Sequence, residues 1–102
     1  MAILHIVNKS PYERNNLTSC LRLAKAGAGL ILIEDGVVAA AEGGKFSGAL
    51  KEAMKDIKIS VLGPDLDARG ISRDKVIEGI DVVDYGGFVD LVAEYDVPQS
   101  WL

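Results

Sequence analysis

The sequence is poor in cysteine and histidine, with one of each among its 102 residues. A single thiol, Cys20, excludes an internal disulfide, a Cys-x-x-Cys redox pair and a cysteine-rich zinc site. Any sulfur chemistry at Cys20 must therefore involve a second molecule. His5 lies in an apolar segment, where we expect a structural role, and no set of metal ligands accompanies it. We therefore predict no metal site.

Basic residues are also few, and they are scattered along the chain. Eleven Lys and Arg face fifteen Asp and Glu, which gives a net charge of −4 at pH 7. Proteins that bind nucleic acid usually carry a basic face, so direct contact with nucleic acid is not expected. The apolar runs are too short for a signal peptide or a membrane span. We expect a cytoplasmic protein with a reduced thiol and no membrane contact.

Short strand-like runs alternate with helical segments along the chain. Candidate strands cover residues 3–7, 30–33, 57–62 and 80–84. Strands that alternate with helices predict a parallel sheet with right-handed crossovers. We therefore expect an α/β fold with a single domain over residues 1–102. Its architecture would be a small three-layer α/β/α sandwich around a mainly parallel sheet of four to five strands.

The predicted helices are placed by their capping and stop signals. Ser10, Pro11 and Glu13 form a capping box, which predicts a helix with Ser10 as its N-cap and Pro11 as its first residue, and Gly27 and Gly29 are expected to end it. Other segments with helical or turn character cover residues 35–41, 47–56, 65–70, 72–75 and 88–95. Pro98 is expected to stop the last helix and leave residues 100–102 as a tail.

Two glycine-rich segments resemble nucleotide-binding motifs, but both fail. Residues 27–29 read Gly-Ala-Gly, yet they precede a strand, whereas the dinucleotide fingerprint must follow one. Residues 43–47 resemble the end of a P-loop, but Ala39 replaces its first glycine and Phe46 replaces its Ser or Thr. A nucleotide- or flavin-binding module is therefore disfavoured, and no cofactor is expected.

The acidic residues have simpler interpretations than catalysis. Asp35 follows a strand at the carboxyl edge of the predicted sheet, a common place for binding sites. The favoured interpretation is that Asp35 caps the next helical segment. Four other acids are expected to be turn and strand-end residues: Asp65, Asp67, Asp81 and Asp84.

Cys20 lies on the border of the apolar stripe that Leu17, Leu21 and Ala24 form on the first predicted helix. A border cysteine can be buried as a small hydrophobe or can be reached by a partner. An isolated thiol has a pKa of roughly 8.5 and needs a cation, a base or a helix N-terminus to form thiolate at neutral pH. Cys20 lies beyond the first helical turn and has no cation on its face. The residues therefore do not indicate a primed nucleophile.

Several segments, in this order, resemble the DsrH/TusB family of sulfur-relay subunits. They are Leu4-His5 with Ser10-Pro11, residues 32–37 with Ala40, residues 66–70, Asp84-Tyr85 with Phe88-Val89, and Trp101. The resemblance implies a DsrE-like fold and assembly with DsrE/TusD-like and DsrF/TusC-like subunits in a heterohexamer. It also implies that the complex passes persulfide sulfur to a DsrC/TusE-type carrier protein.

Cys20 helps to choose between the two branches of this family. DsrH-type members resemble this chain in having a cysteine in the first helix, so the leading hypothesis is the branch that oxidises stored sulfur. Cys20 would then be a persulfide carrier or a contact for the carrier protein. The resemblance places the principal acceptor cysteine in the DsrE/TusD-like subunit, so the chain would be an accessory subunit. The alternatives are a TusB-like subunit that serves 2-thiolation of the tRNA wobble uridine, or a purely structural subunit.

Overall fold

A parallel five-stranded sheet forms the centre of the computed structural model, which describes residues 2–101. All strand pairs are parallel and the strand order is β4-β3-β2-β1-β5. The strands are β1 (Ile3–Val7), β2 (Gly29–Leu32), β3 (Lys58–Leu62), β4 (Asp81–Val83) and β5 (Val97–Trp101). The predicted α/β fold and its parallel sheet are therefore confirmed.

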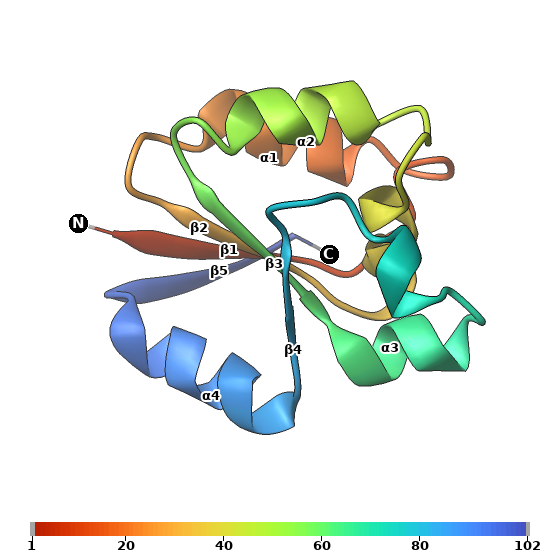
Figure 1. Ribbon diagram of the computed structural model, residues 1–102. Coiled ribbons are helices and arrows are strands. Elements are labelled where there is room, and N and C mark those ends of the chain that lie inside the picture. The colour runs from red at the N-terminus through yellow and green to blue at the C-terminus, as the bar shows by residue number, and fades with distance from the viewer. Residues whose placement is uncertain (1, 102) are drawn as a thin grey trace.

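The helices are distributed unequally between the two faces of this sheet. The α-helices are α1 (Asn16–Leu23), α2 (Ser47–Ala53), α3 (Gly63–Ala68) and α4 (Tyr85–Glu94), and the 3-10 helices are η1 (Glu34–Ala40) and η2 (Arg73–Lys75). Figure 1 shows α1 and α2 together on one face and α4 alone on the other, with α3 at the carboxyl edge. One face therefore has much less cover than the other.

The hydrophobic core is also divided unequally between the two faces of the sheet. Side chains alternate between the two faces along each strand. On the face under α1 and α2, the strand side chains are part of a cluster of sixteen buried residues, which includes Leu30, Leu32 and Ile59. The cluster on the α4 side has three buried residues, Leu4, Ile31 and Leu91. Most of the apolar area that stabilises the fold is therefore on the α1–α2 side.

The first helix begins at Asn16, so the prediction that it begins at Pro11 with Ser10 as its N-cap is wrong. The hydroxyl of Ser10 accepts a hydrogen bond from the backbone N–H of Tyr12 at 3.2 Å, and its carbonyl oxygen accepts one from the N–H of Glu13 at 3.1 Å. Ser10 therefore closes a turn through its hydroxyl and its carbonyl oxygen. The helix forms later, where Leu17 can pack into the core.

Residues 100 and 101 of the expected tail belong to strand β5, which begins at Val97, and residue 102 lies outside the described residues. Pro98 does not prevent this, because β5 is an edge strand that pairs only with β1, and an edge strand has one side that needs no N–H donors. The last helix also begins earlier than predicted, at Tyr85. Asp84 caps it, since a carboxylate oxygen accepts a hydrogen bond from the N–H of Gly87 at 2.7 Å.

Candidate functional site

Cys20 lies in the sealed core between α1 and the sheet. Its side chain has no exposed surface, and it belongs to the same cluster as Leu17, Leu30 and Leu50. Of the two places that the sequence left open for this border residue, the structure shows the buried one. No partner protein can reach the sulfur atom in this conformation.

Burial also decides the protonation state of Cys20. Loss of solvent raises the pKa of the Cys20 thiol to about 12, because the apolar surroundings penalise the thiolate. The thiolate is the form that attacks a persulfide or disulfide sulfur. At neutral pH the Cys20 side chain is therefore a protonated, apolar group in the folded chain.

His5, on strand β1, is the only histidine, and it is engaged with the C-terminal strand. It is 5% exposed, and the indole N–H of Trp101 donates a hydrogen bond to its Nδ1 at 3.1 Å. Burial lowers the pKa of His5, which favours the neutral imidazole that can accept this bond. Among the described residues no hydrogen bond joins His5 to Cys20. His5 thus ties β5 to β1, as its expected structural role requires, and does not activate the thiol.

The carboxyl edge of the sheet holds a compact cluster of charged side chains. Glu34, the first residue of η1, has a φ of 48°, which is unusual for a residue other than glycine. Its backbone N–H donates a hydrogen bond to a carboxylate oxygen of Asp65 at 2.7 Å, from the start of α3. Asp65 therefore holds η1 against α3 at a position where the backbone is strained.

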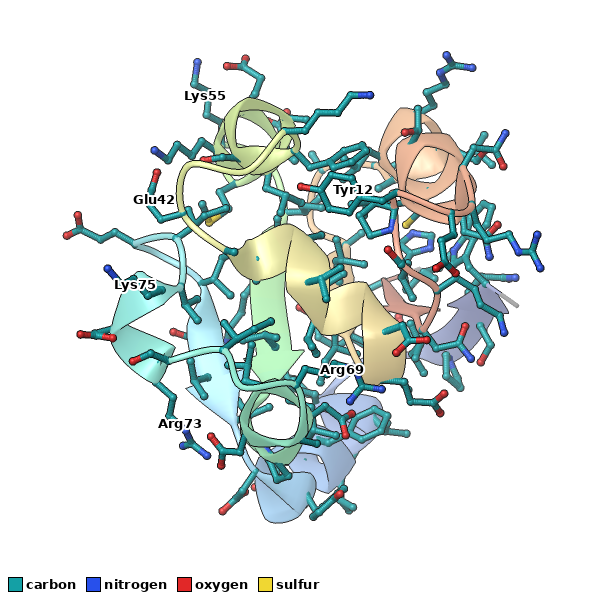
Figure 2. All side chains as sticks on the ribbon, turned by 90° about the vertical axis from the view of Figure 1, so that its right-hand side faces the viewer. Tyr12, Glu42, Lys55, Arg69, Arg73 and Lys75 are labelled. Atoms are coloured by element: carbon teal, nitrogen blue, oxygen red, sulfur yellow. The ribbon has the colours of Figure 1, made fainter. Side chains whose placement is uncertain are left out.

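Arg69 completes this contact between η1 and α3, as Figure 2 shows from the carboxyl edge. Its Nε and Nη2 both donate to one carboxylate oxygen of Asp35, at 3.0 and 2.9 Å, and its Nη1 donates to the carbonyl oxygen of Asp65 at 3.2 Å. The prediction that Asp35 caps a helix is wrong, because Asp35 lies within η1 and binds Arg69 instead. The guanidinium is occupied by these contacts, so the cluster is a structural clamp.

The remaining acids have local roles. Asp67, on α3, forms an exposed ion pair with Arg73 of η2 at 2.9 Å. Asp81 is the first residue of β4, and Asp84 follows the last one, so both are strand-end residues as expected. Within residues 2–101 no group of three or more His, Cys, Asp or Glu side chains is arranged to hold a metal ion.

We predict that Asp65→Ala lowers the free energy of unfolding by about 1–2 kcal/mol. The substitution removes the acceptor of the Glu34 N–H and leaves a strained backbone without its partner. The matched control is Asp67→Ala on the same helix, which removes only an exposed ion pair worth at most about 0.5–1 kcal/mol. Chemical denaturation of the two variants measures the difference. Equal losses would contradict the role of Asp65.

Two hollows on the surface lie next to helix α1. The larger has a volume of about 320 Å³ and is lined by Ile3, His5, Leu23, Lys25, Ala26 and Ala28. The smaller, of about 60 Å³, lies between α1 and the end of α2. Cys20 lines neither of them. Among the described residues, no helix has the length and apolar character needed to cross a membrane.

These observations define a small parallel α/β protein whose one thiol is part of its core. The model of the "DsrH like protein" family matches residues 9–97, and the chain belongs to the DsrH family. The chain is 38% identical to "Protein TusB" of Enterobacter sp. (strain 638) and 33% identical to "Protein TusB" of Shigella flexneri. Each alignment covers 97% of this chain and 100% of the relative.

Two solved structures share the fold of this chain. The ychN protein from E. coli superposes with a TM-score of 0.84 at 22% identity, over 98% of both chains. Protein MTH1491 from Methanobacterium thermoautotrophicum gives a TM-score of 0.73 at 20% identity, over 96% of both chains. At these identities the two structures show the fold alone. The DsrH/TusB family is a family of sulfur-relay subunits that work with TusC- and TusD-type (DsrF- and DsrE-type) partners.

Proposed function

We propose that this chain is a scaffold subunit of a cytoplasmic sulfur-relay complex and that it carries no sulfur itself. In this proposal a TusD/DsrE-like subunit holds the acceptor cysteine, and a TusE/DsrC-like carrier protein takes the persulfide sulfur from it. The observation that carries the proposal is the burial of Cys20, with the pKa of its thiol raised to about 12, in a chain of a sulfur-relay family. The competing prediction, that Cys20 is a persulfide carrier or a carrier-protein contact, requires α1 to move away from the sheet.

We further propose that the complex is a heterohexamer of the TusBCD type that serves 2-thiolation of the tRNA wobble uridine. The curated relatives that support this branch bear the name TusB and match 97% of the chain. The preference for the sulfur-oxidation branch relied on Cys20 as a functional residue. A cysteine that packs as a hydrophobe gives that branch no support.

The test is reconstitution of the complex with Cys20→Ala. The chain is co-expressed with TusC- and TusD-like relatives, and persulfide transfer to a TusE-like carrier is measured by intact mass. We expect undiminished transfer, because the alanine removes only a buried apolar group. As a positive control, loss of the acceptor cysteine in the TusD-like subunit should abolish transfer. A large loss with Cys20→Ala in a complex that still assembles would instead support the carrier role.

A further inference from the structure

The larger hollow lies at the amino edge of the sheet, where the chain leaves α1 and returns to β2. Helix α1 ends at Leu23, and strand β2 begins at Gly29. The hollow beside this connection has a volume of about 320 Å³, and its lining combines four aliphatic side chains with two polar ones: Ile3, Leu23, Ala26, Ala28, His5 and Lys25. Ligand pockets begin at about 300 Å³, so the hollow has room for a molecule of a few carbon atoms.

His5 presents an unpaired N–H group to this hollow. Its Nδ1 accepts the hydrogen bond from the indole N–H of Trp101 at 3.1 Å, so the neutral imidazole carries its proton on Nε2. The residue is 5% exposed, and Nε2 makes no hydrogen bond to another described residue. Solvent still reaches Nε2, because within residues 2–101 the one sealed side-chain polar atom without a partner is Oδ1 of Asn8. A deeply placed, unpaired donor that lines a hollow is the kind of group that orients a ligand.

The charges around the hollow select the sign of its ligand. Lys25 is exposed, and among the described lining residues it is the one that carries a charge. Its ammonium group forms no ion pair with another described residue. The described lining therefore offers a positive charge and the N–H of His5, and it contains no acidic side chain. This combination attracts an anion and disfavours a cation.

The walls of the hollow select an organic anion. Sulfate and phosphate carry four oxygens that need several donors, whereas the described side chains supply two donor groups. The four aliphatic side chains offer such an ion no partner, and an ion that loses water without new hydrogen bonds is strongly disfavoured. A carboxylate has two oxygens, one for each donor group. A short alkyl body attached to it can cover Ile3 and Ala28.

We propose that the larger hollow binds a small aliphatic carboxylate, whose oxygens accept hydrogen bonds from Nε2 of His5 and Nζ of Lys25. The inference goes beyond the proposed function, because the ligand belongs to this chain alone and needs no partner subunit. It also gives His5 two separate roles. Nδ1 ties β5 to β1 through Trp101, and Nε2 holds the ligand.

The first test is a titration of the full chain with butyrate. His5 and Trp101 are the only residues of their types, so the imidazole nitrogen resonances and the indole fluorescence each report on one known residue. We expect a saturable shift of the Nε2 resonance with a Kd of about 1 mM or below. The indole signal should follow it, since Trp101 is bonded to the same ring. The absence of a saturable shift up to about 50 mM butyrate would overturn the site.

Three further probes test the chemistry of the ligand. Butanol and butylamine have the same alkyl body without the negative charge, and sulfate has the charge without the alkyl body. We expect each of them to bind at least about tenfold more weakly than butyrate. Equal binding of butanol or butylamine would overturn the role of the charge. Equal binding of sulfate would show a site for inorganic anions and overturn the carboxylate.

The second test is Lys25→Gln, with Lys75→Gln as its matched control. Both lysines are exposed and both substitutions remove one positive charge, but Lys75 lies on η2 and does not line the hollow. We expect Lys25→Gln to weaken butyrate binding about fivefold, which is the upper range for an exposed ion pair, and Lys75→Gln to leave it unchanged. Equal affinities for the two variants would contradict the contact with Lys25.

The third test blocks the hollow. Ala26→Leu adds bulk at an exposed lining position, and Ala49→Leu adds the same bulk at an exposed position of α2. We expect at least about tenfold weaker binding for Ala26→Leu alone. His5→Phe keeps a ring and removes the N–H, so it should abolish binding; if this variant does not fold in a thermal melt, the Ala26→Leu result decides. Wild-type affinity in Ala26→Leu would place the ligand elsewhere and overturn the inference.

These outcomes are independent of the proposed function. The titrations use this chain by itself, so a failure to bind butyrate leaves the sulfur-relay assignment untouched. A failure of the chain to assemble with TusC- and TusD-like relatives would overturn that assignment and leave the carboxylate site standing.

Discussion

Gly36→Ala is expected to lower the free energy of unfolding by about 2–3 kcal/mol. Gly36 lies in η1, where the chain passes directly over the end of β1. A Cβ atom added at this position would come within 2.4 Å of the carbonyl oxygen of Val7 and 3.1 Å of its carbonyl carbon. Both are backbone atoms of a central strand, so they cannot rotate away. The clash must be relieved by shifting η1, which strains the packing as overfilled cores do.

The same shift would disturb hydrogen bonds that hold this edge together. The N–H of Ile33 donates to the carbonyl of Val7 at 3.0 Å, and the N–H of Gly36 donates to the carbonyl of Ile33 at 2.9 Å. For a chain of this size, a loss of 2–3 kcal/mol corresponds to a fall in melting temperature of about 10–20 °C. Circular dichroism melts and urea denaturation both measure it.

Gly48→Ala is the matched control and should have the opposite sign. Gly48 lies within α2, and a Cβ atom there would meet nothing within 4 Å. Alanine in a helix interior is favoured over glycine by about 0.5–1 kcal/mol, because glycine loses more backbone freedom on folding. Stabilisation by Gly48→Ala with strong destabilisation by Gly36→Ala would confirm the close approach of η1 to β1. Similar melting temperatures for the two variants would contradict it.

The central strands could be predicted from sequence because their signal is local. β2 is a continuous apolar run that is buried on both faces of a parallel sheet, and β3, although it contains Lys58 and Ser60, is buried from Ile59 to Leu62. The fold class followed from their alternation with helices. Strand β5 could not be found in this way. Its residues are mostly exposed, it contains Pro98, and only its pairing with β1 makes it a strand.

Contacts between distant residues account for the other errors. Asp35 and Arg69 are 34 residues apart, so nothing near Asp35 in the sequence indicates that it binds a guanidinium rather than capping a helix. The helix start at Ser10 and Pro11 was predicted from a correct local pattern that the chain uses for a turn. Asp84 was placed at a strand end, but its capping role depended on a helix start that Gly86 and Gly87 obscured.

Cys20 shows most clearly that a local sequence pattern does not determine whether a side chain is buried. The helical spacing placed Cys20 on the border of an apolar stripe, and a border position is compatible with burial and with exposure. In the structure Cys20 is buried, because α1 lies against the sheet with both Leu17 and Cys20 facing the core. The weak activation inferred from sequence, which noted the absence of a cation or base on its helix face, agrees with the raised pKa of the thiol.

Cys20 is therefore expected to react with thiol reagents at least about a thousandfold more slowly in the folded chain than in the unfolded chain at pH 8. Burial raises the pKa of the Cys20 thiol from 9.0 to about 12, which by itself lowers the thiolate fraction at pH 8 by about this factor. Loss of access adds to the protection, because the side chain has no exposed surface. Stopped-flow measurements with a disulfide reagent, in buffer and in urea, give the two rates.

An exposed thiol on the same helix supplies the control. Thr18→Cys in a Cys20→Ala background places a cysteine at an exposed position of α1, and we expect it to react at nearly the unfolded rate. Fast reaction of the native Cys20 would mean that α1 opens readily from the sheet, and the carrier role would then be favoured. If Cys20 still reacts slowly after assembly with the TusC- and TusD-like subunits, the cysteines of those subunits must carry the sulfur. In that case the single cysteine of this chain stabilises the subunit by packing in its core.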